Sequence, residues 1–562
     1  MIDFQRYLLI AAIAALSFML LVEWRNFELP DSTTQSAALK KQSPSESDST
    51  GTNDSPSSID IPVASESTEV PEENGPVVTD ADRIKITTDV LNIEIALQGG
   101  DVVYSALPNF TAKLESNDPF VVLSNNAERT YVAQSGLIGK NATDTANGRP
   151  TFSTSATRFS LQDGQDTLNV DLHYQYNQEV RLVKRFIFER GKYLINVEYL
   201  IDNGSSTDFQ AKFFGQLKRD NSVDPSVDDK GGLFSMKPFM GVAYANNEDL
   251  YSKLAFPKMK DKPLKESVDG GWIGISQHYF LSAWVPPQDQ TNQLNTVVTK
   301  QGMNIARMTG AEVSVPAGQQ GKIGASLYTG PKDQYRLEGI APGLDLTVDY
   351  GWLWWIAQPL FWLLTKIHGF LGNWGWSIIA VTVLIKAAFF QLNAKAFTSM
   401  ANMRKVQPKL VDIKERYADD RQKQSQAMME LYKKEKINPL GGCLPMIVQM
   451  PVFISLYWVL MESIELRHAP FMLWINDLSA MDPYFILPVV MGISMFIQQK
   501  LNPPPPDPMQ AKVMQWLPLI FTFFFLFFPA GLVLYWVVNN TLSIIQQYII
   551  TKGIEKKELA KT

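Results

Sequence analysis

The stretch Trp376-Ser-Ile-Ile-Ala-Val-Thr-Val-Leu-Ile-Lys386-Ala-Ala-Phe-Phe390 is typical of a membrane helix, except that it contains a lysine. A cation near the centre of a bilayer helix costs roughly 2.5–3.5 kcal/mol on insertion scales, so its default interpretation is functional. Snorkelling is the alternative, but Gln391 and Asn393, the first strongly polar residues beyond it, lie about 7 to 10 Å further along the axis. A lysine stem covers only part of that distance. We therefore expect Lys386 to face a polar cavity lined by protein.

Other apolar segments bring the expected number of membrane spans to six. The run Tyr7–Val22 is just long enough to span with help from the interface, and we expect residues 1–27 to be an uncleaved anchor. A signal peptide is the alternative, but no clean small-residue cleavage site follows Val22. The second span is expected within 372–392, at Trp376–Leu392, and four more within 439–550, at Leu440–Met461, Tyr484–Gln499, Val513–Phe527 and Leu532–Ile550.

Charge is strongly partitioned along the 562-residue chain. Residues 28–82 hold 12 acidic and 2 basic residues among many Ser, Thr and Pro, which predicts a disordered acidic linker. Residues 393–436 hold 11 basic and 6 acidic residues, and the tail 551–562 is also basic. By the positive-inside rule, both basic segments belong in the cytoplasm. Six spans with both termini inside then place the region between the first two spans on the exported side.

Residues 83–345 are expected to form that exported domain, with β signals from Arg83 to about Val315. The segment Ile84–Ala96 largely alternates apolar with polar residues, and Tyr193–Ile201 repeats the pattern before an Asp-Asn-Gly turn. Short strands separated by turn signals predict a large antiparallel β-sandwich, here with a helical C-terminal part. Cys443 is the chain's one cysteine, so this domain must be stable without a disulfide.

Residues 346–371 differ from the deeper spans. Proline interrupts their apolar run at Pro359, and aromatic residues dominate it, including Trp352, Trp354, Trp355 and Trp362. Tryptophan is enriched where a membrane meets water, so this segment is expected to be an amphipathic helix lying in the interface.

Polar residues in the membrane segments form two helical series. Thr382 and Lys386 are four residues apart and so share one helix face. The last span carries Asn539, Ser543 and Gln546 at similar spacing, with Asn540 and Gln547 alongside, and Gln449 adds an amide in the third span. Buried amides often do no more than join packed helices. They do not explain the lysine, because no Asp or Glu lies in the central part of any C-terminal span, and its anionic partner is expected to come from elsewhere.

The cytoplasmic segment 393–438 is expected to form a helical hairpin with its turn at Ala418-Asp-Asp420. Apolar residues recur at helical spacing on both arms, which include Met400, Met403, Leu410, Met428 and Leu431. Such a stripe is typically the seam of the hairpin, whereas its methionine content also suits a deformable binding surface.

Enzyme signatures are lacking in the sequence. The four histidines have no metal-ligand spacing, and Gly318-Gln-Gln-Gly-Lys322 is too short for a phosphate-binding loop. We therefore expect no catalytic residues, no metal, no cofactor and no nucleotide hydrolysis. A transporter with Lys386 as an anion site is one alternative, but the inverted repeats it predicts are not found. A carbohydrate-active exported domain is another, and it requires a carboxylate or histidine pair in one pocket.

Several motifs resemble one known family. They are Asn438-Pro-Leu-Gly-Gly-Cys-Leu-Pro445, Gln449-Met-Pro-Val-Phe453, Leu473-Trp-Ile-Asn-Asp-Leu478, Asp482-Pro-Tyr-Phe-Ile-Leu-Pro488, Phe528-Pro-Ala-Gly-Leu-Val-Leu-Tyr535 and, in the exported domain, Gly270-Gly-Trp-Ile-Gly-Ile-Ser-Gln-His-Tyr-Phe280. Together they resemble the YidC family of membrane insertases, in its Gram-negative form with a large periplasmic domain. The likeness covers roughly Trp376 to Ile550 in the family's motif order.

This resemblance implies a multi-pass protein of the bacterial inner membrane with a five-helix core around a polar groove. It implies that nascent membrane proteins are inserted and helped to fold there, alone or with the Sec translocon and its accessory subunits, and that ribosome and signal-recognition machinery contact the hairpin and basic tail. The groove cation of the family aligns with Lys386, although most relatives carry arginine. Thr382 matches a groove-lining position, and Trp536 falls where relatives often have tyrosine. The β domain is implied to resemble a sugar-epimerase sandwich.

Overall fold

The computed structural model describes residues 82–145, 148–226, 238–418, 420–435, 444–502 and 508–559. The expected N-terminal anchor, nearly all of the expected acidic linker, Cys443 and the last three residues of the tail lie outside these ranges. Among the described residues, Val411–Glu435 belong to a different compact unit from the rest of the chain.

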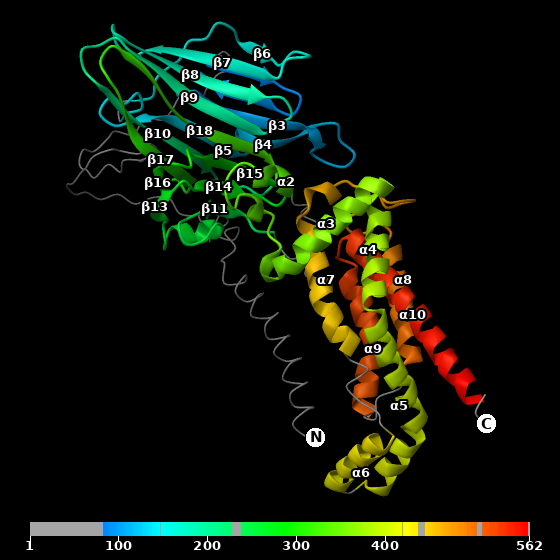
Figure 1. The fold of residues 1–562 in the computed structure, drawn as a ribbon. Coiled ribbons are helices and arrows are strands. Elements are labelled where there is room, and N and C mark those ends of the chain that lie inside the picture. Colours follow the sequence, from blue (N-terminus) through cyan, green and yellow to red (C-terminus); the bar gives the residue numbers. More distant parts are fainter. Residues whose placement is uncertain are drawn as a thin grey trace, which may run out of the picture. The chain divides into compact units, whose positions relative to one another are not determined.

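Two β-sheets make up the first half of the described chain (Figure 1). The ten-stranded sheet has the order β13 (Lys265–Asp269), β16 (Thr291–Val298), β17 (Asn304–Val315), β10 (Phe209–Arg219), β5 (Thr130–Ile138), β4 (Pro119–Asn125), β3 (Asp101–Thr111), β2 (Asn92–Ala96), β1 (Arg83–Thr87) and β6 (Arg158–Ser160). The eight-stranded sheet has the order β12 (Ser252–Ala255), β11 (Gly241–Ala245), β14 (Trp272–Ser276), β15 (Phe280–Val285), β18 (Gln319–Pro331), β9 (Leu194–Asn203), β8 (Val180–Glu189) and β7 (Thr167–Gln175).

The sheets pack through one continuous apolar core. Along β9 buried residues alternate with half-buried ones, as the sequence pattern predicted, and Ile195 and Val197 are fully buried. The same core contains residues from the other sheet, among them Ile84 and Ile93. The sheets are antiparallel apart from the parallel pair β1–β6. The predicted antiparallel β domain is thus confirmed.

The β region is longer than its sequence signals indicated. The expected limit near Val315 is wrong, because β18 runs on to Pro331 and pairs with both β9 and β15. Glycines at 318, 321 and 324 hide the alternation of this strand. Gly324 is required there, because a Cβ at this position would overlap the backbone carbonyl of Val197 on β9. The helical part that follows begins with α2 (Gln334–Glu338), which Asp333 caps.

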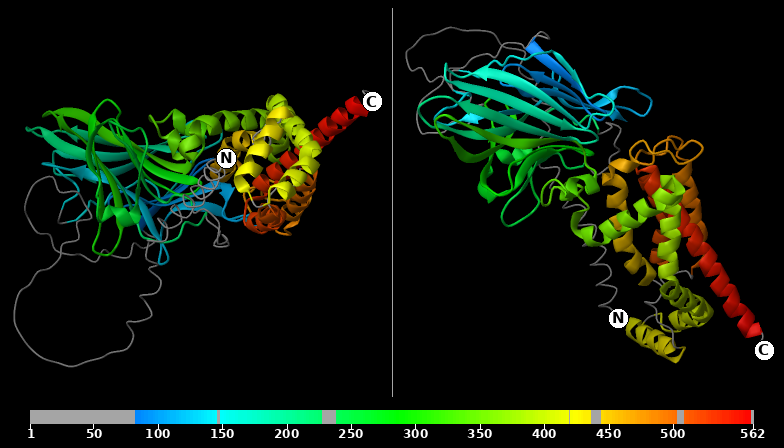
Figure 2. Two further views of the ribbon diagram at one scale, coloured as in Figure 1. Left: turned by 90° about the horizontal axis from the view of Figure 1, so that it is seen from below. Right: turned by 45° about the horizontal axis from the view of Figure 1, so that its top comes forward.

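Helices make up the second half (Figure 1). They are α3 (Trp354–Leu371), α4 (Trp374–Ala388), α5 (Phe390–Arg416), α6 (Arg421–Lys434), α7 (Leu444–Glu462), α8 (Ile486–Leu501), α9 (Pro508–Phe525) and α10 (Ala530–Leu559). The last of them extends as one long helix to the end of the described chain (Figure 2). A second apolar core joins α3, α4, α7 and α10, with Met491 of α8 and Phe525 of α9.

The helix expected to run through Leu392 is interrupted. Helix α4 ends at Ala388, and α5 continues at an angle of 67°. The side chain of Gln546, on α10, donates a hydrogen bond of 3.2 Å to the carbonyl of Phe390 at this break. A side chain that bonds into the backbone ladder is a recognised cause of a sharp bend. Among the described residues, no single helix has the length and hydropathy of a membrane span, whereas α4 and α5 meet that criterion together.

In the unit that contains Val411–Glu435, α6 follows α5 after a short turn. The carboxylate of Asp420 caps α6 by accepting hydrogen bonds from the backbone N–H groups of Gln422 and Lys423. Gln424 then donates a hydrogen bond of 3.1 Å to the carbonyl of Lys414 on α5. These contacts form the turn between two helical arms where the sequence predicted one.

Candidate functional site

Lys386 of α4 reaches a hydroxyl on α10. Its half-buried side chain donates a hydrogen bond of 2.8 Å from Nζ to Ser543 Oγ. The Ser543 hydroxyl donates in turn to the backbone carbonyl of Asn539, at 2.7 Å. Within the described part of the chain, Lys386 has no carboxylate partner. The structure therefore brings together the predicted residues Lys386, Ser543 and Asn539 and leaves the positive charge without a neutralising group of the chain there.

Thr382 lies one turn before Lys386 and is almost fully buried, with 1% of its surface exposed. Its hydroxyl donates a hydrogen bond of 2.7 Å to the carbonyl of Ile378, in its own helix. Such a bond back to the preceding turn satisfies the hydroxyl without a partner on another helix. Thr382 thus lies beside the lysine along α4, with its hydroxyl donated to its own helix.

Gln449 and Trp536 bring α7 and α10 together. The Gln449 side-chain amide donates to Tyr535 Oη at 2.6 Å. The Trp536 ring packs against Phe453 of α7 and Phe525 of α9, with ring centroids 5.0 and 5.7 Å away. The indole N–H of Trp536 is buried and has no hydrogen-bond partner among the residues that the structure describes.

The carbonyl oxygen of the Asn539 side chain, three residues after Trp536 on the same helix, is likewise buried and has no partner within the described ranges. Buried polar atoms in proteins nearly always have a hydrogen-bond partner, so each exception calls for an explanation. An unpaired donor and an unpaired acceptor on one helix face can together bind a polar ligand such as a peptide group.

Sequence reasoning missed Tyr535, whose hydroxyl receives the Gln449 bond. The available signal was its spacing, because Tyr535, Asn539 and Ser543 are four residues apart and so follow one helix face.

The remaining amides of α10 serve as links between helices. Asn540 donates to Ser494 Oγ of α8 at 3.1 Å, and Gln547 donates to the carbonyl of Leu501 at 3.1 Å and to Asn502 Oδ1 at 3.0 Å. For these two residues, the alternative interpretation as contacts between packed helices fits the structure.

The predicted hairpin residues show mixed burial. On α5, Met400 and Met403 are half-buried and Leu410 is buried. On α6, Met428 and Leu431 are half-buried. Partial burial leaves both uses of these side chains open, as a seam and as a binding surface.

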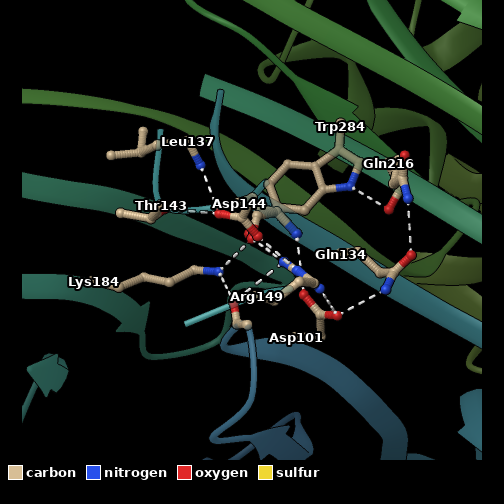
Figure 3. A network of polar contacts seen from close by, with 11 residues as sticks. Asp101, Gln134, Leu137, Thr143, Asp144, Arg149, Lys184, Gln216 and Trp284 are labelled. Atoms are coloured by element: carbon tan, nitrogen blue, oxygen red, sulfur yellow. Dashed lines mark hydrogen bonds and ion pairs between the residues drawn. The ribbon is translucent and has the colours of Figure 1, made fainter. Parts of the chain in front are cut away.

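A second polar cluster lies inside the β domain (Figure 3). Arg149 forms ion pairs with Asp101 and, from Nε at 2.6 Å, with Asp144. Lys184 of β8 is fully buried and donates to the carbonyls of Gly99 at 2.9 Å and Ser135 at 2.8 Å. Burial lowers the pKa of Lys184 to about 7, although the nearby Asp101 and Asp144 oppose the shift.

This cluster connects the two sheets, because Lys184 belongs to one and Ser135 to the other. Both carboxylates are engaged by Arg149, which also donates to the carbonyl of Ser135 at 2.8 Å. A carbohydrate-active site needs carboxylates free to exchange protons with a substrate. The geometry is therefore that of a structural connection between sheets.

Two family models together cover nearly all of the described chain. Residues 83–363 match the YidC periplasmic domain, and residues 366–558 match the 60Kd inner membrane protein. The chain, with its two-sheet domain followed by apolar helices around a lysine, therefore belongs to a class of inner-membrane proteins that have a periplasmic domain. More particularly, the chain belongs to the YidC family.

Named relatives agree with this assignment. The membrane protein insertase YidC of Stutzerimonas stutzeri (strain A1501) is 51% identical over 567 residues, which cover 98% of this chain and 99% of that protein. The membrane protein insertase YidC of Marinomonas sp. (strain MWYL1) is 50% identical, covering 99% of this chain and 100% of that protein. A crystal structure of an active YidC insertase with its first transmembrane domain resolved is 17% identical with a TM-score of 0.37, and the match covers 83% of this chain and 92% of that one.

Proposed function

We propose that the protein inserts integral membrane proteins and helps them to fold, through a polar intramembrane groove that carries the positive charge of Lys386. The observation that carries the proposal is the contact of Lys386 with Ser543, a hydroxyl, where a carboxylate would have neutralised it. The names of the relatives, which are membrane protein insertases, support the same reaction class.

The groove is proposed to lie along Lys386, Thr382, Gln449, Trp536, Asn539 and Ser543. A short polar tail of the client enters it, which shortens the hydrocarbon that the tail must cross. An acidic group about 4 Å from the lysine would gain roughly 4 kcal/mol at an effective dielectric constant near 20. That gain is comparable to the cost of placing a lysine in a membrane helix.

The client's apolar segment then supplies the driving force by partitioning into lipid. The membrane potential adds to it when the translocated tail is acidic. Neither source of energy requires nucleotide, and we propose that the protein works without hydrolysing any and has no enzymatic activity.

The proposed topology has six spans. The anchor within 1–27 is joined by the second span at 372–392 and by four spans within 439–550, while 83–345 is periplasmic and the tail 551–562 is cytoplasmic. The segment 346–371 is proposed to lie in the interface, supported by the exposure of Trp352, Trp354, Trp355 and Trp362 in the absence of lipid. The linker 28–82 tethers the β domain.

The hairpin within 393–438 and the basic tail are proposed to contact the ribosome and the signal-recognition machinery. Met400, Met403 and Leu410 on α5, and separately Met428 and Leu431 on α6, are proposed to supply deformable side chains for such partners. Cooperation with the Sec translocon and its accessory subunits is proposed to involve the periplasmic domain.

Insertion of a short-tailed, single-span client into vesicles, read by protease protection of the tail, tests the role of the charge. We expect Lys386→Ala and Lys386→Glu to reduce insertion about tenfold or more and Lys386→Arg to retain most of it, because arginine keeps the charge. Equal insertion by all variants would contradict charge attraction and would leave only the shortened apolar path. Thr541→Ala, on the exposed face of α10, is the control.

A further inference from the structure

The end of α7 and the turn that follows it, residues 461–468, are held by the β domain at several points. We propose that these contacts form a clamp, and that Lys332 and Glu462 are positioning residues that fix α7, and with it the Gln449 and Phe453 part of the groove. The expected effect on insertion rests on the proposed function, whereas the position of α7 relative to α10 can be tested without it.

The first contact is a buried ion pair. Glu462 is the last residue of α7, and its Oε2 lies 3.1 Å from Nζ of Lys332, which directly follows β18. Their side chains are only 5% and 3% exposed. Lys332 also donates a hydrogen bond of 3.1 Å to the carbonyl of Thr347. A buried charge that loses its partner is strongly destabilising, so this pair favours one arrangement of the two elements.

The second contact satisfies the end of the helix. The last carbonyls of a helix have no partner within it. His278, which lies between β14 and β15, donates from Nε2 to the carbonyl of Met461 at 2.9 Å. The backbone N–H of His278 is itself held by the Asp224 carboxylate at 2.9 Å.

The third set of contacts follows in the turn. Ile464 is 4% exposed and belongs to the apolar core of the β domain. Arg467 donates to the carbonyl of Ala112 at 3.0 Å, and its guanidinium lies over the rings of Phe120 and Phe280, at 5.4 and 5.8 Å. His468 Nδ1 lies 3.0 Å from the hydroxyl of Thr111.

The clamp reaches the groove through the helix itself. Gln449 lies 13 residues before Glu462 on α7, about 20 Å along its axis. Pro451 lies within α7 between these two residues. A shift or rotation at the clamped end therefore reaches Phe453, which packs on Trp536, and beyond the proline it reaches Gln449 and its bond with Tyr535. The β domain would therefore act on insertion without touching the client.

The test uses the full-length protein in vesicles, with Cys443→Ser and the reporter pair Gln449→Cys and Tyr535→Cys. A bis-maleimide crosslinker, which can span the two long side chains that the cysteines replace, joins them within one chain when α7 and α10 keep their register, and peptide mass spectrometry measures the crosslink yield. Insertion is measured in the same variants without the reporter pair. We expect Glu462→Gln and Lys332→Met to lower both the crosslink yield and insertion several-fold.

Two further variants separate positioning from loss of folding. The double variant Lys332→Met with Glu462→Leu replaces both charges by apolar groups and is expected to restore both readouts, because no unpaired buried charge remains. Asp202→Asn breaks the exposed Arg181–Asp202 pair of the same domain and is expected to change neither.

An unchanged crosslink yield in the single variants would overturn the clamp. A lowered yield with unchanged insertion would overturn the link to the groove. If the proposed function is wrong and the clamp is right, the pattern is different. The yield still falls in the single variants, while insertion does not depend on Lys386.

Discussion

At the scale of single residues, the environment of Lys386 shows how a charge is kept available. Its partner Ser543 is a neutral hydroxyl whose own proton is donated to the Asn539 carbonyl. The hydroxyl oxygen is therefore left to accept from the lysine, and this orients the ammonium without cancelling its charge. An acidic partner would hold the lysine more strongly and would compete with an acidic client.

Removal of this hydroxyl should weaken insertion without abolishing it. We expect Ser543→Ala to reduce insertion of the short-tailed client about two- to fivefold, because the charge remains while its orientation is lost. Thr541→Ala is the matched control, since Thr541 makes the same bond to the preceding turn of α10 but is exposed. The vesicle protease-protection assay measures both. Equal losses in the two variants would point to a general effect on α10.

The sequence identified Lys386 because an intramembrane cation is costly wherever it occurs. It could not identify the partner, because Ser543 is 157 residues away and the register between α4 and α10 is set by packing. Chemistry that belongs to one residue is visible in a sequence, whereas a contact between distant helices depends on how their surfaces fit.

At the scale of elements, the same distinction applies. Apolar length predicted α7 and α8 to within four residues at each end, whereas α9 begins five residues before the expected Val513 and α10 runs nine residues beyond the expected Ile550. The bend between α4 and α5 was not predicted, and neither was the contact of the first residue of α5, Phe390, with Gln546, an amide 156 residues further along the chain. Without that contact, the apolar run through Phe390 indicates a straight helix.

Close packing of α8 on α9 depends on Gly492. A Cβ at this position would overlap the Thr522 hydroxyl. We expect Gly492→Ala to lower the thermal unfolding midpoint of the detergent-solubilised protein by roughly 2–10 °C, because overpacking costs about 1–3 kcal/mol. Calorimetry measures this midpoint.

Gly369→Ala is the control for that substitution. Gly369 lies within α3 and a Cβ there would meet nothing within 4 Å, so only the gain in helix propensity remains, and the midpoint should stay or rise. Adding Thr522→Ala to Gly492→Ala should recover part of the loss. A midpoint unchanged by Gly492→Ala would show that the two helices are not closely packed.

At the scale of the whole molecule, a buried ionic cluster around Arg149 and Lys184 connects the two sheets of the β domain. Lys184 has a pKa of about 7 in the folded domain and an ordinary value near 10.5 in the unfolded chain. The unfolded chain therefore binds more protons between these values, and stability should rise with pH from about 7 to 10.

We expect the unfolding midpoint of the full-length protein to rise over this range by several degrees more than in Lys184→Met. Lys322→Met, on the exposed surface of β18, should keep the rise, because that lysine is 72% exposed. Differential scanning calorimetry across the pH series checks this. A parallel pH profile in wild type and Lys184→Met would show that Lys184 titrates normally.

The order of strands also has a consequence for how the protein is made. Strand β9 needs β18 as a neighbour, and the paired residues Asn196 and Ser326 are 130 positions apart. Pairings at such separation form slowly and only after the whole intervening chain is available. The eight-stranded sheet can close only after the chain up to Pro331 is available. In the proposed topology, the whole stretch from β7 to β18 therefore has to reach the periplasm before that sheet can form.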